Sequence, residues 1–258
     1  MKIAIVTGAS SGMGREFALK LDKCGKTEEI WLIALDRSGL EETAAQMKTP
    51  TRIFAADLTK DGIDELRSSL EKEKPDVRWL VYASGFGKFG RYDEIPVEQS
   101  TNTVRLNCES LVAVTEYCLP YMGAGAKIAE FSSVAAFQPT PYQSVYAATK
   151  AFVHSYARAL NAELRPRKIN VCAVCPFWTK TKFFDRAGQT EKHVVIKFAA
   201  MYDPRDVVDK AYKDLMRGKD VSICGFIARS QVRLVRLLPT KTVMNIWIKQ
   251  QKFNRRYR

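Results

Sequence analysis

The chain alternates short apolar runs with longer segments in which apolar residues recur at helical spacing. The apolar runs cover residues 3–6, 30–35, 52–56, 79–83, 127–131 and 169–174, with a weaker run at 221–224. Segments with helical period include residues 40–47, 63–70, 104–121, 145–164 and 207–216. Strands separated by long helical segments form βαβ units. The sequence therefore predicts an α/β fold with about seven parallel strands in one doubly wound sheet and helices on both faces.

Two segments depart from this alternation. Residues 177–200 are irregular and aromatic, which is typical of a substrate loop. Residues 229–258 form a basic amphipathic C-terminal extension instead of another βα unit. Because no linker or repeat divides the chain, we expect residues 1–258 to form a single domain.

Composition narrows the protein class further. The 258 residues are 46% hydrophobic and 27% charged, which excludes a disordered chain. Six scattered cysteines and the absence of a signal-peptide pattern predict a cytoplasmic location. Charged residues interrupt every apolar stretch, so no transmembrane span is expected.

The net charge of +13 is concentrated at the C-terminus. Residues 229–258 contain nine Lys or Arg and no acidic residue, which leaves 32 basic and 28 acidic residues, a net charge of +4, in the first 228. This distribution does not favour nucleic-acid binding by the body of the protein.

A glycine-rich turn follows the first apolar run. Gly8, Gly12 and Gly14 stand between the predicted strand and the next helix. Free backbone N–H groups at a helix N-terminus attract a pyrophosphate, and a Cβ would block its close approach. The turn therefore predicts a dinucleotide site, although the spacing G-x-x-x-G-x-G differs from the usual fingerprint.

The same turn also matches the G-x-S-x-G pattern of a serine hydrolase, with Ser10 as nucleophile. Such a serine needs a histidine, and the chain has only His154 and His193. His154 falls in a strongly helical stretch. Hydrolases also place several strands before this turn, so the hydrolase is the weaker alternative.

A second group of residues has acid–base potential. Tyr146 and Lys150 share one face of a predicted helix, and Ser133 ends the strand at 127–131. A neighbouring cation lowers the pKa of a phenol, which makes Tyr146 a candidate general acid/base. The alternative is that the tyrosine and lysine lie on a solvated helix face.

Together these motifs resemble the short-chain dehydrogenase/reductase family over residues 1–225. The matches are Thr7 to Gly14, Asp57-Leu58, Asn107 with Thr115, Ser132-Ser133, Tyr146 to Lys150, and Pro176 with Thr181. The resemblance implies a Rossmann-type fold, an NAD or NADP cofactor, and a homodimer or homotetramer that pairs through the long helices containing Asn107 and Tyr146.

The resemblance also implies roles for individual residues. Tyr146 would transfer the proton, Ser133 would bind the substrate oxygen, and Lys150 would hold the nicotinamide ribose. Asn107 would maintain a helix distortion with a water that links Lys150 to solvent, and Asp57 would bond the adenine. The full set of expected cofactor-binding residues is Thr7, Gly8, Ser10, Ser11, Gly12, Met13, Gly14, Asp36, Arg37, Asp57, Leu58, Ala83, Ser84, Gly85, Asn107, Tyr146, Lys150, Pro176, Thr179 and Thr181.

The chain departs from the family pattern at three places. Residues 82–85 read Tyr-Ala-Ser-Gly where the family has N-N-A-G, and Phe177 replaces the glycine after Pro176. At the third place, after the second strand, Asp36 favours a ribose hydroxyl and thus NAD, whereas Arg37 favours the 2′-phosphate of NADP. We favour NAD slightly; the alternative is that Asp36 caps the following helix.

Aromatic residues gather where this family builds its substrate pocket. Besides Ser133, the expected substrate residues are Phe86, Phe137, Tyr142, Phe177, Trp178, Phe183 and Phe184, with Phe89 nearby. Rigid apolar walls select bulky hydrophobic substrates. We expect a secondary alcohol or ketone such as a hydroxysteroid or bile acid, with a retinoid, a fatty-acyl chain or an aromatic ketone as alternatives.

The C-terminal extension places Ile246, Trp247, Ile248 and Phe253 among cations. Its apolar side is expected to cover the cleft or a subunit partner, and peripheral membrane contact is the alternative. Cys172 and Cys175 match C-x-x-C without a second pair, so no metal is expected.

These observations predict an NAD(P)-dependent oxidoreductase that interconverts a secondary alcohol and a ketone. The alternative from another class is a catalytically silent dinucleotide-binding regulatory protein.

Overall fold

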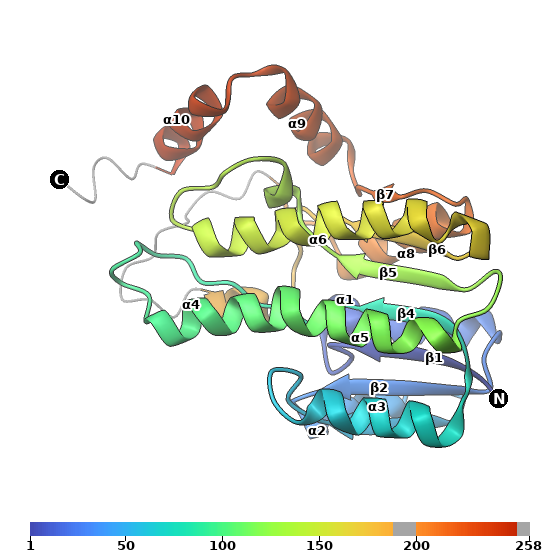
Figure 1. The fold of residues 1–258 in the computed structure, drawn as a ribbon. Coiled ribbons are helices and arrows are strands. Elements are labelled where there is room, and N and C mark those ends of the chain that lie inside the picture. Colours follow the sequence, from blue (N-terminus) through green and yellow to red (C-terminus); the bar gives the residue numbers. More distant parts are fainter. Residues whose placement is uncertain (188–199, 252–258) are drawn as a thin grey trace.

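Seven parallel strands form one sheet in the computed structural model, which describes residues 1–187 and 200–251. The strands are β1 (Lys2–Thr7), β2 (Glu29–Ala34), β3 (Thr51–Ala55), β4 (Asp76–Tyr82), β5 (Lys127–Phe131), β6 (Asn170–Val174) and β7 (Val221–Ser222). Their order is β3-β2-β1-β4-β5-β6-β7, and every pairing is parallel. The predicted Rossmann-type sheet is confirmed (Figure 1).

Helices cover both faces of the sheet, as predicted (Figure 1). One face packs against α3 (Gly62–Glu73), α5 (Ser110–Cys118) and α6 (Ser144–Glu163). The other packs against α1 (Gly12–Cys24), α2 (Arg37–Ala44) and α8 (Pro204–Met216).

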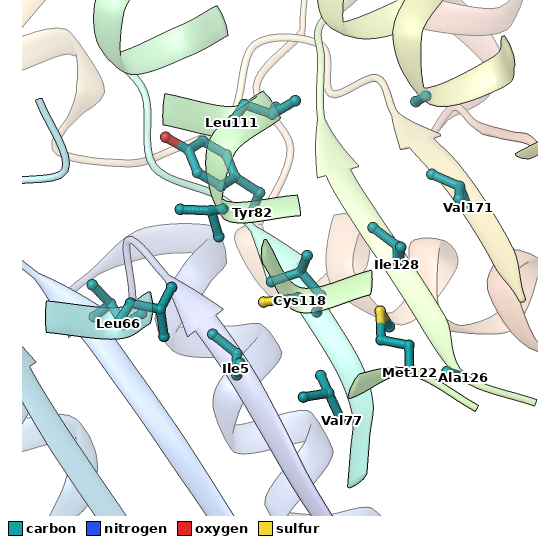
Figure 2. Packing of buried hydrophobic residues seen from close by; sticks show 14 of the residues in the cluster. Ile5, Leu66, Val77, Tyr82, Leu111, Cys118, Met122, Ala126, Ile128 and Val171 are labelled. Carbon is teal, nitrogen blue, oxygen red and sulfur yellow. The ribbon is translucent and has the colours of Figure 1, made fainter. Parts of the chain in front are cut away.

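Burial on both faces explains why the strands are continuous apolar runs. In β1, Ile3 and Ile5 belong to one core, whereas Ala4 and Val6 belong to the other. Figure 2 shows the first core, where Ile5 lies near Leu66 of α3. A strand that is covered on both sides has no solvent face and therefore no polar alternation.

The helical segment predicted at 104–121 is longer and is interrupted. It consists of α4 (Val97–Val104), a π-helical turn (Arg105–Glu109), α5 and a short 3₁₀ turn (Leu119–Tyr121). Within the π-helical turn the Asn107 side chain bonds to Phe86, which belongs to a different part of the chain. A wide turn of this kind often occurs at a functional site.

Two helices follow the sheet, α9 (Phe226–Leu237) and α10 (Thr240–Gln250). They lie beyond the β7 edge of the sheet (Figure 1), and we call them the C-terminal helix pair. The junction with the sheet is Gly225, which has a φ of 88°. A Cβ at Gly225 would lie 2.1 Å from the Tyr202 hydroxyl, so only glycine fits there. The predicted amphipathic extension is thus a helical hairpin, and its last residues, 252–258, lie outside the described residues.

Candidate active site

The glycine turn between β1 and α1 has the shape that a pyrophosphate needs. Gly8 and Gly12 have positive φ angles of 66° and 55°. A Cβ at Gly14 would lie 2.2 Å from the Gly8 carbonyl oxygen, and one at Gly8 would lie 2.9 Å from the backbone of Ala83. The turn therefore tolerates only glycine, and it leaves the N-terminus of α1 open to an anion.

Further residues extend this surface along the carboxyl ends of the strands. The Thr7 hydroxyl accepts a 3.1 Å hydrogen bond from the Ser84 N–H, which fixes the loop after β4 beside the glycine turn. Ser11, Gly12 and Thr181 line a small cavity there. Because Thr181 also lines the large cleft described below, the two hollows adjoin. The residues thus fit a dinucleotide that runs from the turn into the cleft.

Tyr146 and Lys150 lie on one face of α6, one turn apart. Lys150 is 5% exposed, and its Nζ lies 5.8 Å from the centre of the Tyr146 ring. The ammonium donates a 2.7 Å hydrogen bond to the Phe131 carbonyl oxygen at the end of β5. This burial rules out the solvated helix face that the sequence left open.

Ser133 lies beside the phenol. Its hydroxyl accepts a 3.1 Å hydrogen bond from the Ala135 N–H, which fixes the side chain, and it lies close enough to the Tyr146 phenol to lower the pKa of that group. The end of β5 thus brings the serine and α6 brings the tyrosine to one point. A carbonyl oxygen placed between them would meet two hydroxyl donors.

Burial dominates the ionisation of this group. It raises the pKa of Tyr146 to about 12 against the lowering effect of Ser133, and it lowers the pKa of Lys150 to about 8. The expected depression of the tyrosine pKa by Lys150 is therefore not found in the protein alone. Desolvation penalises the charged form of each group and is the largest cause of both pKa shifts. At neutral pH the phenol is therefore protonated and can donate a hydrogen bond.

Asn107 ties three segments together. Its Oδ1 accepts from the Phe86 N–H at 3.1 Å, and its Nδ2 donates to the Phe86 carbonyl at 2.9 Å and to Thr149 Oγ1 at 3.0 Å. A Cβ at Gly85 would lie 2.9 Å from Asn107 Oδ1 and 3.2 Å from Lys150 Nζ. Asn107 therefore positions Gly85 and α6 relative to each other, and its π-helical turn is the distortion that the resemblance implies.

A cleft of about 1010 Å³ opens above these side chains. Ser133, Tyr146 and Lys150 form part of its lining, beside the expected cofactor residues Met13, Ala83, Gly85, Pro176, Thr179 and Thr181. The predicted aromatic walls Phe177, Trp178, Phe183 and Phe184 also line it. The structure thus brings the predicted proton-transfer residues, the expected cofactor residues and an apolar wall into one space.

Some expected substrate residues lie elsewhere. Phe86, Phe137 and Tyr142 are not among the lining residues. Phe137 instead packs on His154, with ring centres 4.6 Å apart, because the short 3₁₀ turn at Val134–Phe137 directs it toward α6. Phe89 is buried in a satellite cluster with Trp178. Part of the predicted loop, residues 188–199, lies outside the described residues.

The residues expected near the adenine lie on loops at the same sheet edge but already have local partners. Asp36 caps α2 by accepting from the Gly39 N–H at 3.1 Å, as the alternative interpretation stated. Arg37 forms an exposed ion pair with Glu41 at 3.8 Å. Asp57 accepts from the backbone and hydroxyl of Thr59, and the Leu58 side chain is buried in the core.

The sequence interpretation missed two groups of cleft residues. The first comprises Gln138, Thr140 and Gln143, which precede α6. The second is the apolar face of the C-terminal helix pair, with Phe226, Ile227, Leu234, Val235, Leu238 and Val243; Ile246 and Trp247 were expected there. The sequence signal that could have identified the second group is the helical spacing of apolar residues in 226–238.

Helix α10 closes over the aromatic wall. Trp247 donates a 3.0 Å hydrogen bond from Nε1 to the Pro141 carbonyl, and its ring stacks on Trp178 at 6.5 Å. The cleft is thus one of the surfaces that the C-terminal extension covers, as one of the three interpretations stated.

The hydrolase alternative has no support in this arrangement. His154 contacts Phe137 and lies 3.8 Å from Cys175 Sγ, whereas Ser10 belongs to the turn beside Gly39 and Arg15. His193 lies outside the described residues. Among those described, no cluster of three metal-ligating side chains occurs, and no helix is long and apolar enough to cross a membrane.

Comparison with known proteins identifies the family. The sequence pattern of the family described as short chain dehydrogenase matches residues 2–192, so the chain belongs to that family. An uncharacterized oxidoreductase of Staphylococcus epidermidis is 32% identical over 178 residues, which cover 68% of this chain and 76% of the relative. A very-long-chain 3-oxoacyl-CoA reductase of Anas platyrhynchos is 30% identical over 189 residues, covering 69% of this chain and 60% of that protein.

The fold comparison agrees. A short-chain dehydrogenase from Sphingobium yanoikuyae, solved in complex with NADPH, superposes with a TM-score of 0.75 at 27% identity. The match covers 86% of this chain and 87% of the other. The family acts on CH–OH and C=O groups, and this chain is an oxidoreductase of that kind.

Proposed function

We propose that the protein uses NAD or NADP to interconvert a ketone and a secondary alcohol on a large apolar substrate. The observation that carries the proposal is the meeting of Ser133, Tyr146 and Lys150 in one cleft with the glycine-lined cofactor surface. A protein that only binds the cofactor has no chemical need for a buried lysine and a serine beside the same phenol, so the catalytically silent alternative is disfavoured.

The chain supplies the proton and the positioning. When bound on this surface, the nicotinamide dinucleotide would supply the hydride or take it up. In reduction, Ser133 and Tyr146 hydrogen-bond the carbonyl oxygen, and the phenol transfers its proton as negative charge develops there. Lys150 favours the phenolate left behind, because the cation lies on the same helix face.

The cofactor-binding roles follow from the same surface. Gly8, Gly12 and Gly14 would hold the pyrophosphate, and Lys150 would hold the nicotinamide ribose. The preference for NAD rests on Asp36, whose carboxylate caps α2 at the loop after β2. A negative charge at this place repels a 2′-phosphate.

The substrate class rests on the walls of the cleft. Four aromatic rings and the apolar face of the C-terminal helix pair surround the catalytic group. Such a space accepts a long or bulky apolar body. The relative from Anas platyrhynchos acts on 3-oxoacyl-CoA by its name, so a long-chain 3-oxoacyl thioester is the first candidate and a hydroxysteroid is the second.

The first experiment is titration of the protein with NADH and NADPH, followed by nicotinamide fluorescence. The tighter cofactor is then used with 3-oxoacyl thioesters, oxosteroids and simple sugars. We expect turnover of the apolar ketones, with NADH preferred. Failure to bind either cofactor, or activity on sugars alone, would overturn the proposal.

Tyr146→Phe tests the mechanism. Loss of a positioned proton donor lowers rates by roughly 10²- to 10⁴-fold, so kcat is expected to fall by at least 100-fold while cofactor affinity stays close to that of the parent. Tyr156→Phe is the matched control, because Tyr156 lies on the same helix and contacts Glu116 instead of the cleft. Near-normal turnover of Tyr146→Phe would refute the mechanism.

A further inference from the structure

Large apolar side chains are exposed on the C-terminal helix pair. Phe226 is 73% exposed and Leu237 is 82% exposed, and Ile227, Leu234 and Ile246 are each more than 40% exposed. On α9 the opposite side is fixed to the body, because Ala228 and Val232 are buried against Val134. The helix is therefore anchored on one side and apolar toward solvent on another.

The same helices are strongly basic. Arg229, Arg233, Arg236, Lys241 and Lys249 lie on the pair, and the chain has no acidic residue after Asp220. None of these five cations forms an ion pair with any residue that the structure describes. Four more cations follow in residues 252–258. The segment thus has positive charge without internal compensation.

The exposed apolar and basic positions share a face of α9. Phe226, Arg233 and Leu237 are spaced at i, i+7 and i+11, which places them along one stripe of an α-helix. Arg233 and Leu237 are both exposed. A surface that combines uncompensated cations with exposed aliphatic and aromatic residues is complementary to an anionic lipid surface, where the apolar side chains enter the headgroup boundary and the cations meet the phosphates.

The mouth of the cleft lies on this same surface. Phe226, Ile227 and Ile246 are exposed and also line the cleft. We propose that the C-terminal helix pair docks on an anionic membrane surface and that apolar substrates pass between the bilayer and the cleft along these three residues. A nucleic acid would use the cations but gives no reason for exposed Leu237. The docking does not depend on the proposed oxidoreductase function, whereas the passage of substrates rests on it.

Vesicle co-sedimentation without cofactor or substrate tests the docking. The probes are vesicles of phosphatidylcholine alone and of phosphatidylcholine with phosphatidylglycerol. The parent protein is expected to bind the anionic vesicles at low ionic strength and to lose binding as salt screens the charges.

Two variants separate the charge from the apolar contribution. Arg233→Glu and Leu237→Gln do not alter the cleft lining, and each is expected to weaken vesicle binding by about tenfold or more. Lys213→Glu is the control: the same charge change lies on α8, on the other side of the sheet, and should leave binding close to that of the parent.

Three results would overturn the proposal. The first is absence of binding to anionic vesicles at low salt. The second is loss of binding in Arg233→Glu but not in Leu237→Gln, which would show a general polyanion surface such as one for nucleic acid. The third is conversion of a dimer to a monomer by Leu237→Gln in sedimentation velocity, which would show that a second copy covers this face. Inactivity of the enzyme on every ketone tested would not affect any of these results.

Discussion

Gln143 has an unpaired amide nitrogen in the cleft that Tyr146 also lines. The residue is 3% exposed, it lines the cleft, and its Nε2 has no hydrogen-bond partner among the described residues. It immediately precedes the first residue of α6, and both Gln143 and Tyr146 line the cleft. A buried donor without a partner costs roughly 1–3 kcal/mol, and a second oxygen of the substrate would remove that cost.

We therefore expect Gln143→Leu to raise KM for a 3-oxoacyl thioester more than it lowers kcat, because the thioester carbonyl loses a donor. The same variant should increase the free energy of unfolding by about 1 kcal/mol in the absence of ligand, since the unpaired amide is gone. Steady-state kinetics and urea denaturation measure the two effects. Gln143→Glu is the comparison, because it keeps the shape but replaces the donor. An unchanged KM in both variants would contradict the role.

Glu130 is a buried carboxyl group whose protonation state depends on pH. It lies in β5 at 0% exposure, accepts a 3.1 Å hydrogen bond from Thr115, and has an unpaired Oε2. Desolvation raises its pKa to about 8 from 4.5. As pH rises from about 4.5 to 8, the unfolded chain loses this proton while the folded chain retains it, so folding becomes less favourable across that window.

Glu130→Gln is expected to remove this pH dependence. The free energy of unfolding of the parent should fall by a few kcal/mol between pH 5 and pH 8, whereas that of the variant should change less. Guanidinium denaturation at several pH values measures the difference. Equal slopes for both proteins would show that Glu130 titrates normally.

At the scale of elements, Trp247 attaches α10 to the wall of the cleft. Trp247 stacks on Trp178 and donates to the Pro141 carbonyl, so it links the helix to both the aromatic wall and the segment before α6. The position of Trp247 predicts that it contributes to substrate binding and not to proton transfer.

Trp247→Ala is expected to raise KM for apolar ketones by about tenfold or more while kcat changes little, because a buried aromatic contact is lost without disturbing Tyr146. Trp247→Phe keeps the ring and removes the N–H, so its KM should be intermediate. Steady-state kinetics with one long and one short ketone measures both. A kcat loss as large as that of Tyr146→Phe would contradict a role in binding.

The sequence predicts the elements best where a strand is buried on both faces. The runs at 3–6 and 127–131 correspond to β1 and β5, because two covered faces leave no room for polar residues. The π-helical turn at Asn107 was expected only through the family resemblance, because hydrophobic periodicity does not record the hydrogen bond that the Phe86 N–H donates to Asn107, twenty-one residues away. The C-terminal helix pair was predicted only as an amphipathic extension. Apolar residues of the pair contact the irregular loop that contains Trp178. The hydrophobic periodicity of the sequence does not show which segment they contact.

Across the whole molecule, the helices α5 and α6 expose aromatic residues on the side away from the sheet. Phe152 is 43% exposed and stacks on Tyr156 at 6.0 Å, and Tyr117 of α5 is 36% exposed. We propose that a second copy covers this surface, as the family resemblance implies.

Phe152→Asp is therefore expected to shift the protein from a dimer or tetramer toward a monomer, because a charge would be buried at the interface. Sedimentation velocity at micromolar concentration measures the shift. The exposed Lys213→Glu serves again as a control. A monomeric parent protein would contradict the proposal.

Part of the candidate active site could be predicted from the order of the motifs along the chain. Order along the chain places the glycine turn, Ser133 and Tyr146 at the carboxyl ends of parallel strands, where they must converge. The second half of the cleft was not predictable in the same way. Gln143 and Phe226 belong to segments whose position depends on how distant parts of the chain pack, and a motif does not record that packing.

Gly225 is the junction between the sheet and the C-terminal helix pair. The family pattern ends at residue 192, before the C-terminal helix pair, which follows a single glycine held against Tyr202. The residues proposed for proton transfer thus lie in the part that the family pattern covers, whereas the C-terminal helix pair, which forms much of the cleft wall, follows that part. An engineer who wishes to change the substrate of this enzyme has a natural place to graft: a different helical hairpin joined at residue 225 would meet an unaltered catalytic group.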